Sequence, residues 1–333
     1  MIAKRSTTGR LALASLFALA ILGRPAASGA AEFPDRSIRV IIPFAGAGTT
    51  DIVSRILFER VSQLLGQTII IDNRPGAGGN IGLDLAAKAP PDGYTLIVDD
   101  PSVSLAALPA LYPDLGLDPV KDLAPIALFG TTGAVLLVTN SLPAKTLAEF
   151  IALAKSRPGE LTYGSTGIGT PGHLNAALFS WLTGIKTLHV PYRNGGQGTT
   201  DLLAGRIAFW IAPIPTRLDQ VRAGALRALA VSGNERSPDL PEVPTVKEAG
   251  FGEFDASTDY AVFAPSGTPP DIVNKLYAAI KSAVEDDTVR QKLRAAGVEP
   301  LLKGPADVSD ILKAQTARWT AVIGDAGIKA DVH

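Results

Sequence analysis

The feature that most constrains the fold is an arrangement that recurs four times along the chain: a short apolar segment, a loop of small residues, and a segment with helical periodicity. The four loops span residues 43–51, 73–80, 163–173 and 191–199. Each apolar segment predicts a strand, and each periodic segment predicts a helix. Strands that alternate with helices indicate an α/β fold with a largely parallel sheet, whose ligand loops lie at the carboxyl ends of the strands.

The first of these junctions is the clearest. The β-branched run Ile38–Ile42 predicts a buried strand, and the segment after Asp51 has apolar residues at helical spacing. The first N–H groups of a helix lack intrahelical partners and the N-terminal end of its dipole is positive, so such a loop suits a carboxylate or a phosphate. Alternatively, Gly46 and Gly48 only shape a tight turn, and Thr50 or Asp51 only caps the helix.

The N-terminal 31 residues have the order of a secretory signal peptide. Basic residues come first, followed by the apolar stretch LALASLFALAIL and by small residues up to Ala31. This order predicts a periplasmic protein that is cleaved near Ala30 or Ala31. The twelve apolar-rich residues fall short of the ~20 that cross a bilayer, so the cleaved chain is expected not to span the membrane. A lipoprotein is excluded because the sequence contains no cysteine.

Charge and composition narrow the range of partners. The chain has 31 basic and 32 acidic residues, without the basic excess of nucleic-acid-binding proteins, so we expect no nucleic-acid partner. Loss of the four basic residues of the leader takes the formal charge from −1 to −5. A bound anion is therefore expected to be held by local dipoles and hydroxyl groups. With no cysteine and three histidines, the sequence predicts no metal site and no cofactor.

The sequence contains the glycine pattern of a dinucleotide-binding loop but lacks the acidic residue that such a site requires. Residues 167–172, GIGTPG, match G-x-G-x-x-G between a predicted strand and a predicted helix. A nucleotide site should also have an acidic residue at the end of the next strand to hold the ribose. Here the strand 187–190 runs into residues 191–194, PYRN, without an acid, so a dinucleotide is not expected.

A hydrolase interpretation rests on Ser165, His173 and Asp201. The segment 164–167 lacks the G-x-S-x-G spacing of a nucleophile elbow, and His173 follows Ser165 by only eight residues, unlike the order Ser, acid, His of α/β-hydrolases. We interpret His173 as the first residue of a helix with its ring near the loop. His189, inside an apolar strand, is interpreted as a core residue with its hydrogen bonds satisfied.

Two adjacent carboxylates, Asp99 and Asp100, follow the third predicted strand. Neighbouring side chains of an extended segment point to opposite faces. They are therefore interpreted as turn or cap residues rather than as a carboxylate pair.

Longer motifs in the mature region resemble those of one family. In chain order they read FPDRSIRVIIPFAGAGTTDIVSR, DNRPGAGGNIG, APPDGYTL, DPVKDLAPI, LTYGSTGIGTPGHL, HVPYRNGGQGTTDLLAGRI, LRALAVSGNERSPDLPEVPTVKEAG and VFAPSGTP. The sequence resembles the substrate-binding receptors of tripartite tricarboxylate transporters, also called Bug receptors. The resemblance covers the chain from Phe33 to about residue 325.

The resemblance implies a two-lobed α/β fold of the Venus flytrap, type II-like class of periplasmic binding proteins, with a ligand cleft between the lobes. The expected division is a signal peptide at 1–31, a first part of lobe 1 at 32–134, lobe 2 at 135–255, and a return to lobe 1 with the C-terminal helices at 256–333. Such receptors bind a small organic acid and hand it to the permease subunits of the transporter.

The resemblance also implies which residues bind the carboxylate, partly through ordered water. They are Phe44, Ala45, Gly48, Thr49, Thr50 and Asp51 in the first loop, Ser165, Thr166, Gly167, Thr170, Pro171, Gly172 and His173 in the second, and Tyr192 and Asn194 in the third.

The chain departs from the family pattern at two informative positions. The first loop usually reads Pro-Gly-Gly but has Gly46-Ala47-Gly48 here, and Ala47 should fit if its φ is negative. Asp259 stands where an aromatic residue is common. We therefore expect Asp259 to bind an amine, amide or hydroxyl group of the ligand, whose acid end rests on the Phe44 to Asp51 loop. Alternatively, Asp259 is a turn residue that points to solvent.

Taken together, the sequence predicts a periplasmic solute-binding protein for a small carboxylate or related organic acid, and not an enzyme. Two alternatives remain open at this point. One is a secreted hydrolase that uses Ser165 or a cleft carboxylate. The other is an extracytoplasmic sensor that presents its ligand to a signalling partner.

Overall fold

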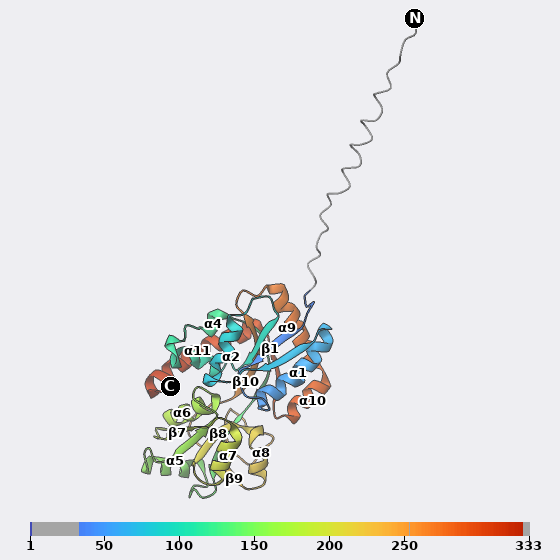
Figure 1. The fold of residues 1–333 in the computed structure, drawn as a ribbon. Helices are drawn as coiled ribbons and strands as arrows, with labels where there is room; N and C mark the ends of the chain where they lie inside the picture. Colours follow the sequence, from blue (N-terminus) through green and yellow to red (C-terminus); the bar gives the residue numbers. More distant parts are fainter. Residues whose placement is uncertain (2–32, 253, 329–333) are drawn as a thin grey trace. The chain divides into compact units, whose positions relative to one another are not determined.

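The computed structural model describes Met1, residues 33–252 and residues 254–328 (Figure 1). Apart from Met1, the predicted signal peptide lies outside these residues. Residues 36–333 group into a single unit by their contacts. None of the helices in the described part of the chain combines the length and the apolar character needed to cross a membrane.

The first sheet has six strands in the order β11-β4-β10-β3-β1-β2. They are β1 (Ile38–Ile42), β2 (Ile69–Asn73), β3 (Thr95–Asp99), β4 (Leu123–Thr132), β10 (Thr258–Pro265) and β11 (Glu299–Lys303). β1 pairs with β2 and β3 in parallel, whereas β10 and β11 pair antiparallel with their neighbours. The side chains of Ile38, Val40, Ile41 and Ile42 are fully buried, which confirms the predicted buried strand.

The second sheet has five strands in the order β7-β6-β8-β5-β9. They are β5 (Ala134–Thr139), β6 (Thr162–Ser165), β7 (Leu188–Pro191), β8 (Phe209–Pro213) and β9 (Leu226–Val231). β6 pairs in parallel with β7 and β8, and β5 pairs antiparallel with β8 and β9. The two sheets make the fold a two-lobed α/β fold.

The helices of the described chain are α1 (Thr49–Leu65), α2 (Asn80–Ala87), α3 (Ser104–Leu111), α4 (Pro119–Asp122), α5 (Leu147–Ser156), α6 (Pro171–Thr183), α7 (Gly195–Leu203), α8 (Leu218–Arg222), α9 (Pro270–Glu285), α10 (Asp287–Ala295) and α11 (Pro305–Ala326), with short 3₁₀ turns η1 (Ala77–Gly79), η2 (Pro113–Leu115) and η3 (Ile214–Thr216). A helix follows each of the four predicted loops, namely α1, α2, α6 and α7, whereas α3 and α4 were not predicted. Helices α1, α9 and α10 contact one another (Figure 1). Helix α11 packs on α3.

The expectation of a largely parallel sheet is wrong for both sheets. The chain passes from β4 in the first sheet to β5 in the second through residue 133, and it returns as β10, which lies between β4 and β3. A strand that returns from the opposite direction pairs antiparallel. Strands β4 and β11 were also missed, because each contains a proline, Pro125 and Pro300, and a proline within an apolar run argues against a strand.

Candidate functional site

The first junction leaves the N-terminus of a long helix uncapped. Residues 45–48 are exposed, and α1 begins at Thr49 with Gly48 as the cap residue. No side chain bonds the first turn from the cap position, so the alternative that Thr50 or Asp51 serves as the cap is wrong. Because the first N–H groups of a helix have no intrahelical partners, this end of α1 can accept an anion or its bridging waters.

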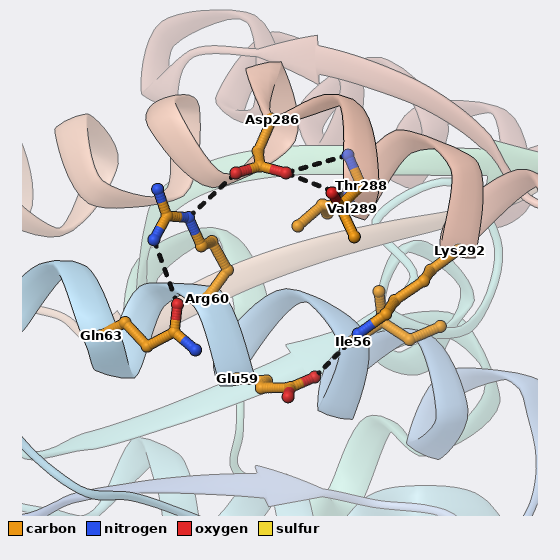
Figure 2. Close-up of a pocket in the computed structure, with 8 residues that line it drawn as sticks. All are labelled: Ile56, Glu59, Arg60, Gln63, Asp286, Thr288, Val289 and Lys292. Atoms are coloured by element: carbon orange, nitrogen blue, oxygen red, sulfur yellow. Dashed lines mark hydrogen bonds and ion pairs between the residues drawn. The ribbon is translucent and has the colours of Figure 1, made fainter.

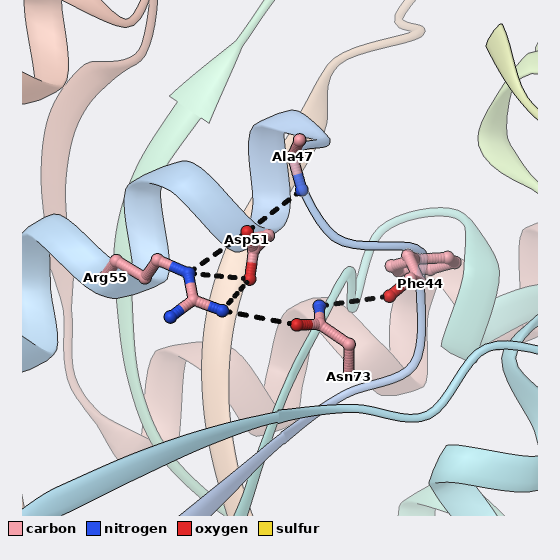
Figure 3. A network of polar contacts seen from close by, with 5 residues as sticks. All are labelled: Phe44, Ala47, Asp51, Arg55 and Asn73. Carbon is pink, nitrogen blue, oxygen red and sulfur yellow. Dashed lines mark hydrogen bonds and ion pairs between the residues drawn. The ribbon is translucent and has the colours of Figure 1, made fainter.

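Asp51 instead holds the loop together from inside the helix (Figure 3). Its Oδ2 accepts the Ala47 N–H at 3.0 Å, and Arg55 donates to both carboxylate oxygens. Asn73 links the network to the strand side, since it accepts from Arg55 and donates to the Phe44 carbonyl at 3.2 Å. Burial alone would raise the pKa of Asp51, but the hydrogen bonds from Arg55, Ala47 and Asn73 outweigh it and lower the pKa. The carboxylate is thus charged and already neutralised by Arg55.

Ala47 does not have the negative φ at which an alanine would fit the first loop without strain. Its φ is +63°, in the left-handed region that favours glycine. The bond from its N–H to Asp51 fixes this conformation. The alanine therefore takes over a position where the family pattern has a glycine, at a conformational cost that the Asp51 network offsets.

Three carboxylates gather at the end of β3 in the same sheet. Asp99 accepts the Ser104 hydroxyl at 2.7 Å, and Asp100 Oδ1 accepts the Ser102 N–H at 2.8 Å, as expected of residues that bond a following turn. The expectation that they form no carboxylate pair is wrong, because the charge of Asp99 contributes to raising the pKa of Asp100. Asp100 Oδ2 is buried without a hydrogen-bond partner. Burial raises the pKa of Asp99 to about 6 and, together with the charge of Asp259, raises the pKa of Asp100 well above its usual value. The spacing of these residues in the sequence did not predict that the three carboxylates lie together.

Asp259 belongs to that cluster, so the alternative of a turn residue that points to solvent is wrong. It lies in β10 and is half-buried, its Oδ2 accepts the Ser102 hydroxyl at 2.5 Å, and its N–H donates to Asp100 Oδ1 at 3.4 Å. Burial raises its pKa. The next residue, Tyr260, hydrogen-bonds the side chain of Thr49, which connects β10 with the N-terminus of α1.

The second junction is held by neutral groups. The Ser165 hydroxyl donates to the Gly167 carbonyl at 2.9 Å, and the Thr170 hydroxyl reaches the same oxygen at 2.7 Å. Both side chains are buried, while Thr166 between them is exposed. Helix α6 begins at Pro171, so His173 is its third residue rather than its first. His173 Nδ1 accepts the Gly169 N–H at 3.2 Å.

Two histidines stack beside this loop. The rings of His173 and His189 lie 4.1 Å apart, and burial lowers their pKa values to about 4 and about 3. His189 is half-buried in the edge strand β7 rather than in the core. Its Nε2 lies 2.6 Å from Ser165 Oγ. Because Ser165 is fully buried and its hydroxyl also bonds the Gly167 carbonyl, this pair does not expose a nucleophile, which argues against the hydrolase alternative.

The third loop uses its predicted residues for packing and capping. Tyr192 is buried on Trp210, and its hydroxyl donates to Asp201 at 2.9 Å. Asn194 is exposed and caps α7 by accepting the Gln197 N–H at 3.0 Å. Arg217, which sequence reasoning passed over, is buried nearby and donates to the Gly195 carbonyl. The sequence did not predict a role for Arg217, because this residue follows η3 and belongs to none of the loop motifs.

The predicted site residues differ in how far they reach solvent. Ala45, Gly48, Thr166 and Asn194 are exposed; Phe44, Thr49, Thr50, Gly167, Pro171, Gly172 and Asp259 are half-buried; Asp51, Ser165, Thr170, His173 and Tyr192 are buried.

Loops of the two sheets meet at η1. A Cβ added to Gly79 would lie 3.6 Å from the Phe44 ring, and one added to Gly78 would lie 2.5 Å from the Ile168 carbonyl oxygen. The glycine-rich loop after β2 therefore touches both the first and the second junction. Glycine is needed here because φ is positive at both positions and no side chain fits against Ile168.

A surface pocket between α1 and α10 lies apart from these loops (Figure 2). It is lined by Ile56, Glu59, Arg60, Gln63, Asp286, Thr288, Val289 and Lys292. Its charges pair among themselves, Lys292 with Glu59 at 3.2 Å and Arg60 with Asp286 at 3.1 Å. No group of three His, Cys, Asp or Glu side chains suited to a metal ion occurs in the part of the chain that the structure describes.

Comparison with known proteins identifies the family of this chain. Residues 53–328 match the model of the tripartite tricarboxylate transporter family receptor. Protein BugT of Bordetella pertussis is 36% identical over 322 residues, which cover 97% of this chain and 98% of BugT.

Solved structures agree with this match. A Rhodopseudomonas palustris protein solved with adipate has a TM-score of 0.82 and 36% identity, over 90% of this chain and 99% of that one. MatC from the same organism, with bound malate, has a TM-score of 0.81 and 33% identity, over 87% of this chain and 100% of MatC. The periplasmic binding protein BugD has a TM-score of 0.80 and 28% identity, over 89% and 99% of the two chains. The chain belongs to the tripartite tricarboxylate transporter receptor family, whose members are substrate-binding receptors and not enzymes.

Proposed function

We propose that this receptor is exported to the periplasm, loses its signal peptide near Ala30 or Ala31, and captures a small carboxylate or related organic acid between its two lobes. It then delivers the acid to the membrane permease subunits of a tripartite tricarboxylate transporter. Adipate and malate in two related structures support an organic acid as the ligand.

The observation that carries this proposal is the N-terminus of α1. Its cap residue Gly48 has no side chain, and the loop in front of it is exposed. The nearby carboxylate of Asp51 is neutralised by Arg55 and does not repel a bound acid. Uncapped N–H groups at a positive helix end bind a carboxylate without a cation in contact with it.

Thermal unfolding of the mature protein with a library of C3 to C6 mono- and dicarboxylates tests the proposal. An acid present at 100 times its dissociation constant should stabilise the protein by about 2.7 kcal/mol. Absence of stabilisation by every acid in the library would contradict the proposal.

A variant pair then locates the site. Removal of the hydroxyl in Thr49→Ala should weaken binding of a stabilising acid by roughly 0.5 to 1.5 kcal/mol. The control is Thr320→Ala, an exposed hydroxyl on α11, which should leave the affinity unchanged. Equal affinities of both variants and the wild type, measured by titration calorimetry, would place the ligand away from α1.

A further inference from the structure

A buried cation without a counter-ion among the described residues lies beside the third loop. Arg217 is 9% exposed, and it follows η3 at the end of β8. Burial lowers its pKa, and no acidic group of the described residues contributes to that pKa. A buried charge is costly unless it is paired, so an unpaired guanidinium in this position calls for an explanation.

The protein satisfies the guanidinium only in part. Nη1 donates to the Thr216 carbonyl at 2.7 Å and Nη2 to the Gly195 carbonyl at 3.1 Å, while the group as a whole lies 5.4 Å from the centre of the Trp210 ring. Nε is buried and has no hydrogen-bond partner. An arginine has five N–H bonds in a planar fork that matches the two oxygens of a carboxylate. The two carbonyls therefore hold the guanidinium in place, while some of its N–H groups have no hydrogen-bond partner among the described residues.

The surroundings of the fork favour an anion. Gly195 is the first residue of α7, a helix of nine residues, and Gly196 follows it without a side chain. The Asn194 cap takes the N–H of Gln197, so it does not cover the first residue of the helix. A Cβ on Gly195 would lie 3.2 Å from Arg217 Nη2 and 3.8 Å from the methyl group of Thr166, which brings the exposed Thr166 to the same place.

We propose that Arg217, with the N-terminus of α7 and Thr166, binds an acid group of the ligand from the side of the second sheet. This inference rests on the proposed function and specifies its ligand class: an acid with a second anionic group, one end on the α1 loop and the other on Arg217. Such a ligand bridges the two lobes, because its two charged ends are held by elements of different sheets.

Calorimetric titration of the mature protein with adipate, malate and adipic acid monoamide tests the inference. The monoamide has nearly the shape of adipate but lacks one charge. We expect Arg217→Gln to weaken adipate binding about 10-fold to 100-fold, since a charge-assisted bidentate contact is lost. The preference of the wild type for adipate over the monoamide should fall toward one in this variant.

Arg193→Gln is the matched control. Arg193 is exposed in the loop before α7, so its loss changes the net charge by the same amount without touching the fork. It should alter adipate affinity by less than about threefold, because exposed charges are screened. An equal loss in both variants would show a general charge effect and would overturn the inference.

Circular dichroism decides whether Arg217→Gln is folded. A folded variant with the adipate affinity of the wild type would overturn the inference. If the variant does not fold, Arg217→Lys retains the charge but not the fork, and the inference requires a loss of at least fivefold in preference for adipate over the monoamide; an unchanged preference would overturn it. A wild type that binds neither adipate nor malate would instead contradict the proposed function, and the inference with it.

Discussion

The loops of the two sheets bury opposite charges. In the first sheet, carboxylates are buried: Asp51 is paired with Arg55, while Asp99 and Asp100 at the end of β3 are held by hydroxyl and N–H groups. In the second sheet, the Arg217 cation and the neutral His173 are buried. The difference teaches that similar strand, loop and helix sequences build chemically distinct surroundings. For the proposed site between the lobes, this predicts that a ligand is recognised by its orientation as well as by its shape.

The largest effects are expected in the pH dependence of the second junction. His173 stays neutral in the folded protein down to about pH 4, whereas the unfolded chain takes up the proton near pH 6.5. Stability is therefore lost as the pH falls from 6.5 to 4, by about 3 kcal/mol. In His173→Asn, which retains an acceptor for the Gly169 N–H, the melting temperature between these pH values should decline less steeply. An unchanged slope would contradict this assignment.

The end of β3 in the first sheet should respond to pH with the opposite sign and a similar size. The Asp99 carboxyl of the folded protein retains its proton up to about pH 6, while the unfolded chain loses it near pH 3.8. Its contribution of about 3 kcal/mol is present below pH 3.8 and is lost as the pH rises through 6. Asp99→Asn keeps the oxygen that accepts from Ser104 and should remove this loss. Denaturant unfolding of wild type and variant at pH 4 and pH 7.5 measures it, and the same change in stability between the two pH values in both proteins would argue against burial of a proton at Asp99.

A single substitution should disrupt the packing of Trp210, the ring near which Arg217 lies. A Cβ at Gly198 would lie 2.1 Å from the Trp210 ring, so Gly198→Ala should destabilise the protein by about 1 to 3 kcal/mol through overpacking. Gly196→Ala is the control in the same helix, because its Cβ would meet Asn194 Oδ1 at an ordinary 3.5 Å. It should be neutral or stabilising. Thermal unfolding of the pair distinguishes a tight Trp210 contact from the general effect of alanine in α7.

The next largest effect is expected on the ligand affinity when Asp259 is substituted. If its carboxylate binds an amine of the ligand, Asp259→Asn should cost an amine-containing acid at least about 1.5 kcal/mol and leave or improve the binding of a plain dicarboxylate. Asp255→Asn is the control, since Asp255 is exposed four residues earlier. Equal calorimetric affinities of wild type and Asp259→Asn for aspartate and for succinate would show that Asp259 does not contact the ligand and only accepts from Ser102.

The smallest effect concerns the strained residue of the first loop. Ala47→Gly should stabilise the protein by up to about 1 kcal/mol, because glycine adopts a positive φ without a clash. Ala45 is exposed but does not have a positive φ, so Ala45→Gly should destabilise slightly through chain entropy. Denaturant midpoints of the two variants that shift in the same direction would contradict the strain at Ala47.

Local periodicity determined much of the fold in advance. The strand Ile38–Ile42, the helix that follows it and the glycine loops before α2 and α6 could be predicted, because hydrophobic spacing and small residues act over a few neighbours. The resemblance of the longer motifs to the family also predicted the two-lobed fold. The antiparallel pairing of β10 with β3 and β4 could not be predicted, since it joins segments more than 125 residues apart.

Only the tertiary structure decided how the polar side chains are used. Asp51 bonds the first loop from inside α1, Tyr192 packs on Trp210 and donates to Asp201, Asn194 caps α7, and Arg217 belongs to no motif. The ligand contacts of Tyr192 and Asn194 stay a prediction. The sequence determines which chemical groups are available near each loop. Which of them finds a partner within the protein, and which is left for a ligand, depends on distances between segments that are remote in the chain.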